Sequence, residues 1–302
     1  MLDLHLPIAD ITISALVPAA LGGGIGFLSG LLGVGGGFLL TPLLMLVGIP
    51  AQFAVATGAM PVMASSVSGA LAHWRRGNVD LAMAIALTAG GLVGATVGVR
   101  LLVLLRSLGQ VDLVIGLCYV LLLGTLGSTM MVESVRTIRR QRAGQPPVGR
   151  KRRHFWIHNL PLKMRFRRSQ LYISALLPVA IGLMVGTLTA IMGVGGGFVM
   201  VPAMIYVLGM RTSTTIGTSL VQIAITSAAT TVLQAMTSHA VDVMLGVVLA
   251  GTSVIGAQLG ARLGAKLPGE KLRVVLAGLV LAVCVQVAIG LFTAPVDAFS
   301  VD

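Results

Sequence analysis

The stretch GLLGVGGGFLLTPLL at residues 30–44 contains the hexapeptide GVGGGF, which occurs a second time at residues 193–198. Each copy interrupts a long apolar run, and a proline follows four residues after its phenylalanine, at Pro42 and at Pro202. Glycine breaks inside apolar sequence of membrane length leave backbone groups that lipid cannot hydrogen-bond. Two breaks at matching positions of two half-sequences indicate a binding site built from discontinuous helices, as in a transporter.

The composition indicates a membrane protein. Of the 302 residues, 56% are hydrophobic and 10% are charged, and the mean hydropathy is +0.98. Apolar runs long enough to cross a bilayer, about 20 residues each, recur along the whole chain. The composition therefore predicts an all-α polytopic membrane protein.

The apolar runs form nearly the same series twice. In each half, an opening helix precedes the glycine break, and a short apolar segment and three full spans follow it. The expected first-half segments are 11–32, 38–49, 54–74, 79–105 and 111–131, and the expected second-half segments are 171–192, 198–209, 213–236, 241–266 and 271–293. We therefore expect a first transmembrane repeat at 1–132, a basic loop at 133–170 and a second repeat at 171–302.

The charge distribution predicts an orientation. Segment 133–170 holds twelve of the 21 Lys and Arg residues and a single acid, Glu133. The positive-inside rule places this loop in the cytoplasm, against anionic lipid headgroups, and tracing the spans outward then places both termini outside. Each half makes an odd number of crossings, so we expect an inverted repeat. The expected location is the cell membrane, specifically a bacterial inner membrane.

Small residues recur every fourth position on equivalent helices. The first set is Gly90, Gly94 and Gly98, and the second is Gly256, Gly260 and Gly264. Such stripes let helix backbones approach closely in lipid, so we interpret them as scaffold.

Four motifs resemble those of the sulfite exporter TauE/SafE family of integral membrane transporters. They are GLLGVGGGFLLTPLL at 30–44, GALAHWRRGNVD at 69–80, GVGGGFVMVP at 193–202 and IGTSL at 216–220. The resemblance covers nearly the whole chain outside the central loop. It implies export or uptake of small sulfur-containing or organic anions such as sulfite or sulfonates. We expect a secondary transporter that works as an exporter, with uptake as the alternative direction. The chain departs from the pattern at ATGAMP (56–61), the counterpart of IGTSL, and in the length of its basic loop.

The glycines are candidate substrate ligands. A helix that begins inside the membrane leaves its first N–H groups unpaired, at the positive end of its dipole, and glycine lets that backbone approach an anion. The candidates are Gly33, Gly35, Gly36, Gly37, Gly193, Gly195, Gly196 and Gly197. The alternative is that these glycines only permit a tight hairpin.

Polar side chains after the breaks complete the candidate site. Hydroxyl and amide groups of Thr57, Thr218, Ser219 and Gln222 suit an oxyanion, although interhelical hydrogen bonding would explain them equally. Asp80 and Asp242 begin equivalent helices, where an N-cap is the expected role. Coupling of transport to an ion is the alternative role for these two carboxylates.

The remaining motifs argue against catalysis. The sequence contains no GxxxxGK[ST] loop, no HExxH and no Cys/His cluster of metal-ligand spacing, so we expect no enzyme activity, cofactor or metal. We interpret the positive charge as lipid-facing and expect no nucleic-acid partner. The oligomeric state has no signal in the sequence. Two other functions stay open: a passive anion channel that uses the same helix ends, and a non-transporting membrane scaffold subunit.

Overall fold

The computed structural model describes residues 3–6, 11–32, 37–109, 111–142, 163–166, 168–264 and 269–292. The helices of this part of the chain are α1 Leu16–Leu32, α2 Gly37–Leu46, α3 Ala51–Arg75, α4 Leu81–Ser107, α5 Val111–Arg142, α6 Leu176–Met192, α7 Gly197–Tyr206, α8 Thr212–Thr237, α9 Val243–Gly264 and α10 Gly269–Phe292. The strands are β1 Asp3–Leu6, β2 Ile11–Ser14, β3 Lys163–Phe166 and β4 Leu171–Ser174. The predicted all-α membrane fold is confirmed, with two small hairpins added.

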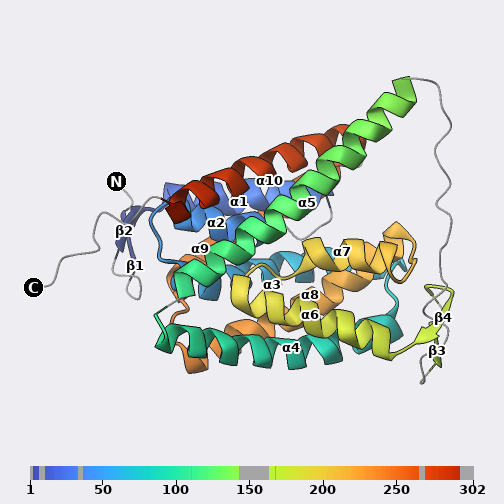
Figure 1. Ribbon diagram of the computed structural model, residues 1–302, viewed down its shortest axis with the longest axis horizontal. Helices are drawn as coiled ribbons and strands as arrows, with labels where there is room; N and C mark the ends of the chain where they lie inside the picture. The colour runs from blue at the N-terminus through green and yellow to red at the C-terminus, as the bar shows by residue number, and fades with distance from the viewer. Residues whose placement is uncertain are drawn as a thin grey trace, which may run out of the picture.

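A short antiparallel hairpin precedes each opening helix. β1 pairs with β2 and β3 pairs with β4, and the two hairpins lie at opposite ends of the molecule (Figure 1). The prediction of helix from residue 11 and from residue 171 was therefore wrong for the first four residues. Ile-Thr-Ile-Ser and Leu-Tyr-Ile-Ser are β-branched and alternating, which favours a strand. Pro18 and Pro178 fall in the first turns of α1 and α6, where proline is tolerated.

The helix α5 continues well past the expected end of its span at residue 131. It runs to Arg142, into the segment predicted as a basic loop. Residues 132–142 are polar but include strong helix formers such as Glu and Arg. Falling hydropathy therefore marked the end of the apolar span, not the end of the helix. The segment 143–162 lies outside the described residues.

Within the part of the chain that the structure describes, five helices are long and apolar enough to cross a membrane. They are Ala51–Arg75, Leu81–Ser107, Leu113–Thr137, Thr212–Thr237 and Val243–Leu263. By contrast, α2 and α7 have 10 residues each, or about 15 Å at the usual helical rise. The hydrocarbon core is about 30 Å thick, so these two helices that follow the glycine breaks reach only part of the way across.

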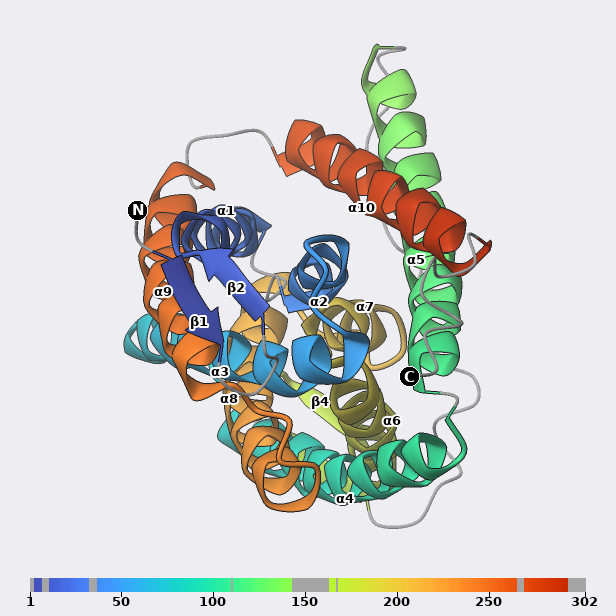
Figure 2. The same ribbon diagram turned by 90° about the vertical axis from the view of Figure 1, so that its left-hand side faces the viewer.

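Helices of one half pack chiefly on helices of the other. The most extensive contacts join α4 to α6 and α1 to α9, followed by α5 with α10 and α3 with α8. Figure 2 shows α2 and α7 in the middle of the bundle, with the other helices around them. In the two half-sequences, α1 corresponds to α6 and α4 corresponds to α9. Replacing each helix by its counterpart therefore converts the pair α4–α6 into the pair α9–α1. The two halves are thus interlocked rather than separate domains.

Glycine produces the closest of these contacts. A Cβ added at Gly94 would lie 2.1 Å from Leu183 O, and one at Gly256 would lie 2.2 Å from Gly23 O. Real Cβ atoms do not approach so closely, so the helix backbones touch directly at these glycines. The interpretation of Gly90, Gly94, Gly98 and Gly256 as packing residues is confirmed.

The hairpin β3–β4 is anchored by its apolar face. Phe166 is fully buried in a cluster with Met83 and Leu87 of α4, Val185 of α6 and Met200 of α7. Side chains alternate along a strand, so the neighbouring Arg165 points away from this cluster and is exposed. The hairpin therefore closes one end of the bundle and presents Arg165 on its other face.

Candidate functional site

The second glycine break is a tight connection between α6 and α7. Gly193, Gly195 and Gly196 have φ angles of 68°, 71° and 66°, in the left-handed region that side chains disfavour. Gly193 N–H donates to Thr189 O at 2.8 Å, which terminates α6. The expected tight turn is confirmed for this copy. In the first copy, Gly33, Gly35 and Gly36 lie outside the described residues, whereas Gly37 is buried at the start of α2.

Neighbouring helices enclose the second break closely. A Cβ at Gly193 would lie 2.3 Å from Val55 O of α3, and one at Gly195 would lie 2.2 Å from Val62 Cγ1. A Cβ at Gly196 would lie 2.2 Å from Val185 Cγ1 of α6. All residues from 193 to 197 are buried. The glycines are therefore required for packing whatever else they do.

The two breaks meet each other. A Cβ at Gly37 would lie 2.7 Å from Val194 O in the second break. One residue further on, the rings of Phe38 and Phe198 have centroids 5.2 Å apart. Phe38 and Phe198 occupy the same position in the two copies of GVGGGF. The starts of α2 and α7 are thus adjacent in the middle of the bundle (Figure 2).

The N-terminus of α7 has no side-chain cap. Its cap residue is Gly196, whose carbonyl accepts hydrogen bonds from Val199 N–H at 3.1 Å and Met200 N–H at 2.9 Å. Ahead of these, the N–H groups of Gly197 and Phe198 donate to no other described residue. The described side chains nearest to Gly195 and Gly196, those of Val62, Ile223, Val185 and Thr189, are uncharged. Unpaired N–H groups at a buried helix start can donate hydrogen bonds to a bound anion.

Thr57 and Thr218 form a reciprocal pair of contacts between the halves. Thr218 Oγ1 of α8 accepts a hydrogen bond from Asp80 N–H at 3.0 Å, just before α4. Thr57 Oγ1 of α3 accepts one from Asp242 N–H at 3.1 Å, just before α9. Both threonines are fully buried. The structure thus places their hydroxyls at the starts of α4 and α9, and Gly58, next to Thr57, approaches the second break at Gly193 O.

Asp80 and Asp242 cap their helices, as the capping prediction required. Asp80 Oδ1 accepts from Met83 N–H at 3.3 Å, and Asp242 Oδ1 accepts from Leu245 N–H at 3.0 Å. Asp80 Oδ2 also accepts from Ser169, from its N–H at 2.8 Å and its hydroxyl at 2.7 Å. Both carboxylates are buried. A role in ion coupling stays a prediction.

Gln222 of α8 is fully buried, and its side chain lies against α4. Its Nε2 donates to Thr226 Oγ1 at 2.9 Å, whereas its Oε1 has no hydrogen-bond partner among the described residues. A Cβ at Gly91 of α4 would lie 2.8 Å from this Nε2. Ser219, one helical turn away, donates its hydroxyl to Ile216 O of its own helix. Of these two candidates, only Gln222 leaves a buried polar atom unpaired.

A small cavity lies beside the start of α2. It has a volume of about 10 Å³, enough for about one water molecule. Its lining includes Gly37, Pro61 and three serines, Ser29, Ser65 and Ser253. The residues at the matching positions of the opposite halves are Gly197, Gln222, Thr189 and Thr226 in the second half and Gly91, the counterpart of Ser253, in the first. The Gln222 side chain lies there against Gly91, so the two halves differ at this point.

Comparison with known protein families identifies one family that matches most of the chain. The family described as Sulfite exporter TauE/SafE matches residues 18–287. The chain belongs to the sulfite exporter TauE/SafE family. It is thus a multi-pass membrane transporter, which agrees with the five long apolar helices of its described residues.

Curated members of the family carry similar descriptions. The chain is 27% identical over 260 residues to the probable membrane transporter protein YjnA of Bacillus subtilis, covering 85% of this chain and 93% of that one. It is 31% identical over 212 residues to a probable membrane transporter protein of Xylella fastidiosa strain 9a5c, covering 70% of each. No solved structure matches the chain.

Some side chains at the break were missed by the sequence analysis. Tyr119 of α5 is fully buried, and its hydroxyl donates to Met192 O, the last carbonyl of α6. Gln234 Nε2 of α8 donates to Ala190 O of the same helix end at 2.8 Å. A tyrosine and a glutamine inside apolar spans are the available signal, because a buried hydroxyl or amide needs a partner.

Proposed function

We propose that this protein is a secondary transporter that exports small sulfur-containing or organic anions such as sulfite or sulfonates. The anion binds between the two glycine breaks, where α2 and α7 begin. The observation that carries the proposal is the meeting of the breaks, at Gly37 with Val194 O and at Phe38 with Phe198. Two helix starts then face one uncharged, buried region, which favours a small anion without a buried cation.

Gln222 is the side chain that we assign to recognition of the anion. Its amide can turn about its last torsion, so that Oε1 faces Thr226 Oγ1 and the Nε2 donors face the space that Oε1 now occupies. A rotated amide would present two N–H donors to this buried space between α4 and α8. Pro61 stands at the matching first-half position and offers no donor, so binding is expected to be asymmetric between the halves.

The proposal requires the bundle to open. A cavity of about 10 Å³ beside Gly37 is too small for an oxyanion, which occupies more than one water molecule does. We infer that binding selects a conformation in which the helices around the breaks have separated.

We also propose an inverted repeat, with residues 1–132 and 171–302 as its two halves and segment 133–170 in the cytoplasm. Support comes from the hairpins at opposite ends of the molecule (Figure 1). The exchanged pairs α1–α9 and α4–α6 and the reciprocal Thr57 and Thr218 contacts agree with it. An axis in the membrane plane would relate such halves.

Accumulation of labelled anion in proteoliposomes tests the function. With a proton or sodium gradient imposed, we expect radiolabelled sulfite or a sulfonate to reach a higher concentration on one side than its own electrochemical gradient allows. Flux that only dissipates that gradient would mean a passive channel. A scaffold subunit would show no flux at all. In that case, deletion of residues 140–165 should abolish the cellular role of the protein.

A further inference from the structure

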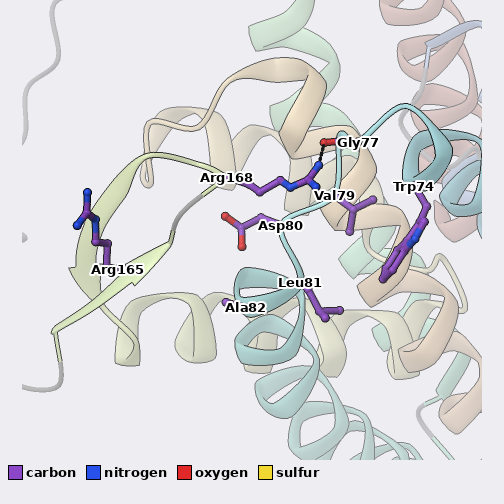
Figure 3. Close-up of a pocket in the computed structure, with 8 residues that line it drawn as sticks. All are labelled: Trp74, Gly77, Val79, Asp80, Leu81, Ala82, Arg165 and Arg168. Atoms are coloured by element: carbon purple, nitrogen blue, oxygen red, sulfur yellow. Dashed lines mark hydrogen bonds between the residues drawn. The ribbon is translucent and has the colours of Figure 1, made fainter.

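A large cavity lies away from the glycine breaks, at the end of the bundle closed by β3–β4. Its volume is about 490 Å³. Figure 3 shows Arg165 of β3 on one side and Trp74 of α3 on the other, with Arg168 and Asp80 between them. The turn from α3 to α4 completes the lining, with Gly77, Val79, Leu81 and Ala82.

The cavity is basic. Arg165 makes no hydrogen bond or ion pair with another described residue, and Arg168 donates to Gly77 O rather than to a carboxylate. Arg75 and Arg76 are exposed at the adjacent end of α3. Among the described residues of the lining, Asp80 is the only carboxylate, and it is 2% exposed.

Asp80 forms no ion pair with Arg165 or Arg168 among the described contacts. Its two oxygens accept hydrogen bonds from Met83 and Ser169 within the protein. The guanidinium groups of Arg165 and Arg168 therefore line a water-accessible space, and neither is paired with a carboxylate among the described residues. Such a site has the charge to bind an anionic group.

The rim of the cavity continues into two apolar stripes. Trp74 belongs to a stripe on α3 with Leu71 and Val67, at helical spacing, and each of the three is 53% exposed. Leu81 begins a similar stripe on α4 with Ile85, at 51% and 61% exposure. Both helices are long enough to span a membrane, so these stripes face lipid. Exposed tryptophan at a span end is typical of the headgroup level.

We propose that this cavity binds the headgroup of an anionic phospholipid, with its phosphate beside Arg165 and Arg168. The acyl chains would lie along the stripes that start at Trp74 and Leu81. The volume suits an organic ligand such as a glycerophosphate headgroup, and basic pockets between membrane helices are known to take such groups. This site is separate from the glycine breaks, so it does not depend on the transport proposal.

Thermal unfolding of the purified protein in detergent tests the site. We expect phosphatidylglycerol, added to the micelles, to raise the Tm by several degrees more than phosphatidylcholine does at the same concentration. The difference between the two lipids isolates the anionic headgroup. Glycerol 1-phosphate, which has the same phosphate without acyl chains, should leave the Tm unchanged at that concentration.

Arg165→Gln is the decisive variant, because Arg165 holds no other part of the described structure. It should remove at least half of the phosphatidylglycerol-specific shift without changing the Tm in phosphatidylcholine. Arg165→Lys should retain most of the shift. Arg100→Gln is the matched control, because Arg100 is also exposed but lies toward the other end of α4, and it should retain the whole shift.

Three outcomes would overturn the proposal. One is an equal shift with phosphatidylglycerol and phosphatidylcholine. Another is a phosphatidylglycerol shift that Arg165→Gln leaves unchanged. The third is an Arg165-dependent shift with glycerol 1-phosphate alone, which would make the cavity a site for soluble anions. Native mass spectrometry of the wild type and Arg165→Gln, counting bound phosphatidylglycerol, provides an independent reading of the same comparison.

Discussion

Gly196 combines a left-handed backbone with a contact that leaves no space for a side chain. Its φ is 66°, and an added Cβ would lie 2.2 Å from Val185 Cγ1. We expect Gly196→Val to abolish transport, because the side chain would be strained by about 1–2 kcal/mol and would displace the start of α7. Loss of folding would have the same effect on transport. The decisive measurement is therefore calorimetric sulfite binding to the folded, purified variant, where unchanged affinity would reduce the break to a structural turn.

We expect Gln222 to lower the stability of the folded protein and to raise its affinity for the anion. An unpaired buried polar atom costs about 1–3 kcal/mol, and Gln222 Oε1 is one such atom. Gln222→Met should therefore leave the Tm equal to or above that of the wild type. The same change should lower the affinity for sulfite at least tenfold, since a hydrogen bond to a charged group contributes about 1.5–3 kcal/mol.

The matched control for Gln222 is Gln258→Met. Gln258 is exposed on α9, with a 3.4 Å contact to Ser68. It should change neither the Tm nor sulfite affinity. If Gln222→Met lowers the Tm and leaves sulfite affinity unchanged, the carboxamide serves only to join α4 and α8.

At the level of elements, glycine contacts decide which helices pair. A Cβ at Gly26 of α1 would lie 2.2 Å from Ser253 O of α9, whereas one at Gly24 would meet nothing within 4 Å. We expect Gly26→Ala to lower stability by about 1–3 kcal/mol through overpacking. Gly24→Ala, on the same helix, should raise it by up to about 1 kcal/mol. Thermal unfolding of the two variants makes the comparison, and equal effects would contradict the observed orientation of α1.

The reciprocal threonine contacts tie α3 to α9 and α8 to α4. Thr57→Val and Thr218→Val would each leave a buried aspartate N–H without an acceptor, at a cost of about 1–3 kcal/mol. Thr125→Val is the control, because the Thr125 hydroxyl donates only to carbonyls of its own helix, and its loss should be close to neutral. A similar Tm for all three variants would show that the two contacts between halves contribute nothing.

Periodicity and hydropathy predicted the elements that contact lipid, because these two patterns report only on contact with lipid. They located the long spans and the second break, since a break is a local property of glycine; residues 33–36 of the first break lie outside the described residues. They missed β2 and β4, whose four residues are too few to distinguish from the start of an apolar helix. They ended α5 at residue 131 because hydropathy does not distinguish a polar helix from a loop. The pairings of Thr57 with Asp242 and of Thr218 with Asp80 join residues 185 and 138 positions apart, which one sequence does not reveal.

At the scale of the whole molecule, the inverted repeat gives a topological prediction. Leu108 is exposed in the connection between α4 and α5, on the side opposite to the basic segment if the halves are inverted. In a background with Cys118→Ala and Cys284→Ala, we expect Leu108→Cys and Arg150→Cys to react with a membrane-impermeant maleimide from opposite faces. Labelling of both from one face of sealed vesicles would contradict the repeat, and labelling of both after permeabilisation controls for reactivity.

The exchange of helices between halves has a consequence for how the protein is made. The face of α1 that contains Gly26 finds its partner only when α9 emerges from the ribosome, roughly 230 residues later. At about 5–20 residues per second, the delay is between about 10 and 45 s. The complementary pair, α4 and α6, can form much sooner. Early in biogenesis, α1 therefore resides in the bilayer with a glycine face covered only by lipid, and assembly is complete only after nearly the entire chain has been inserted.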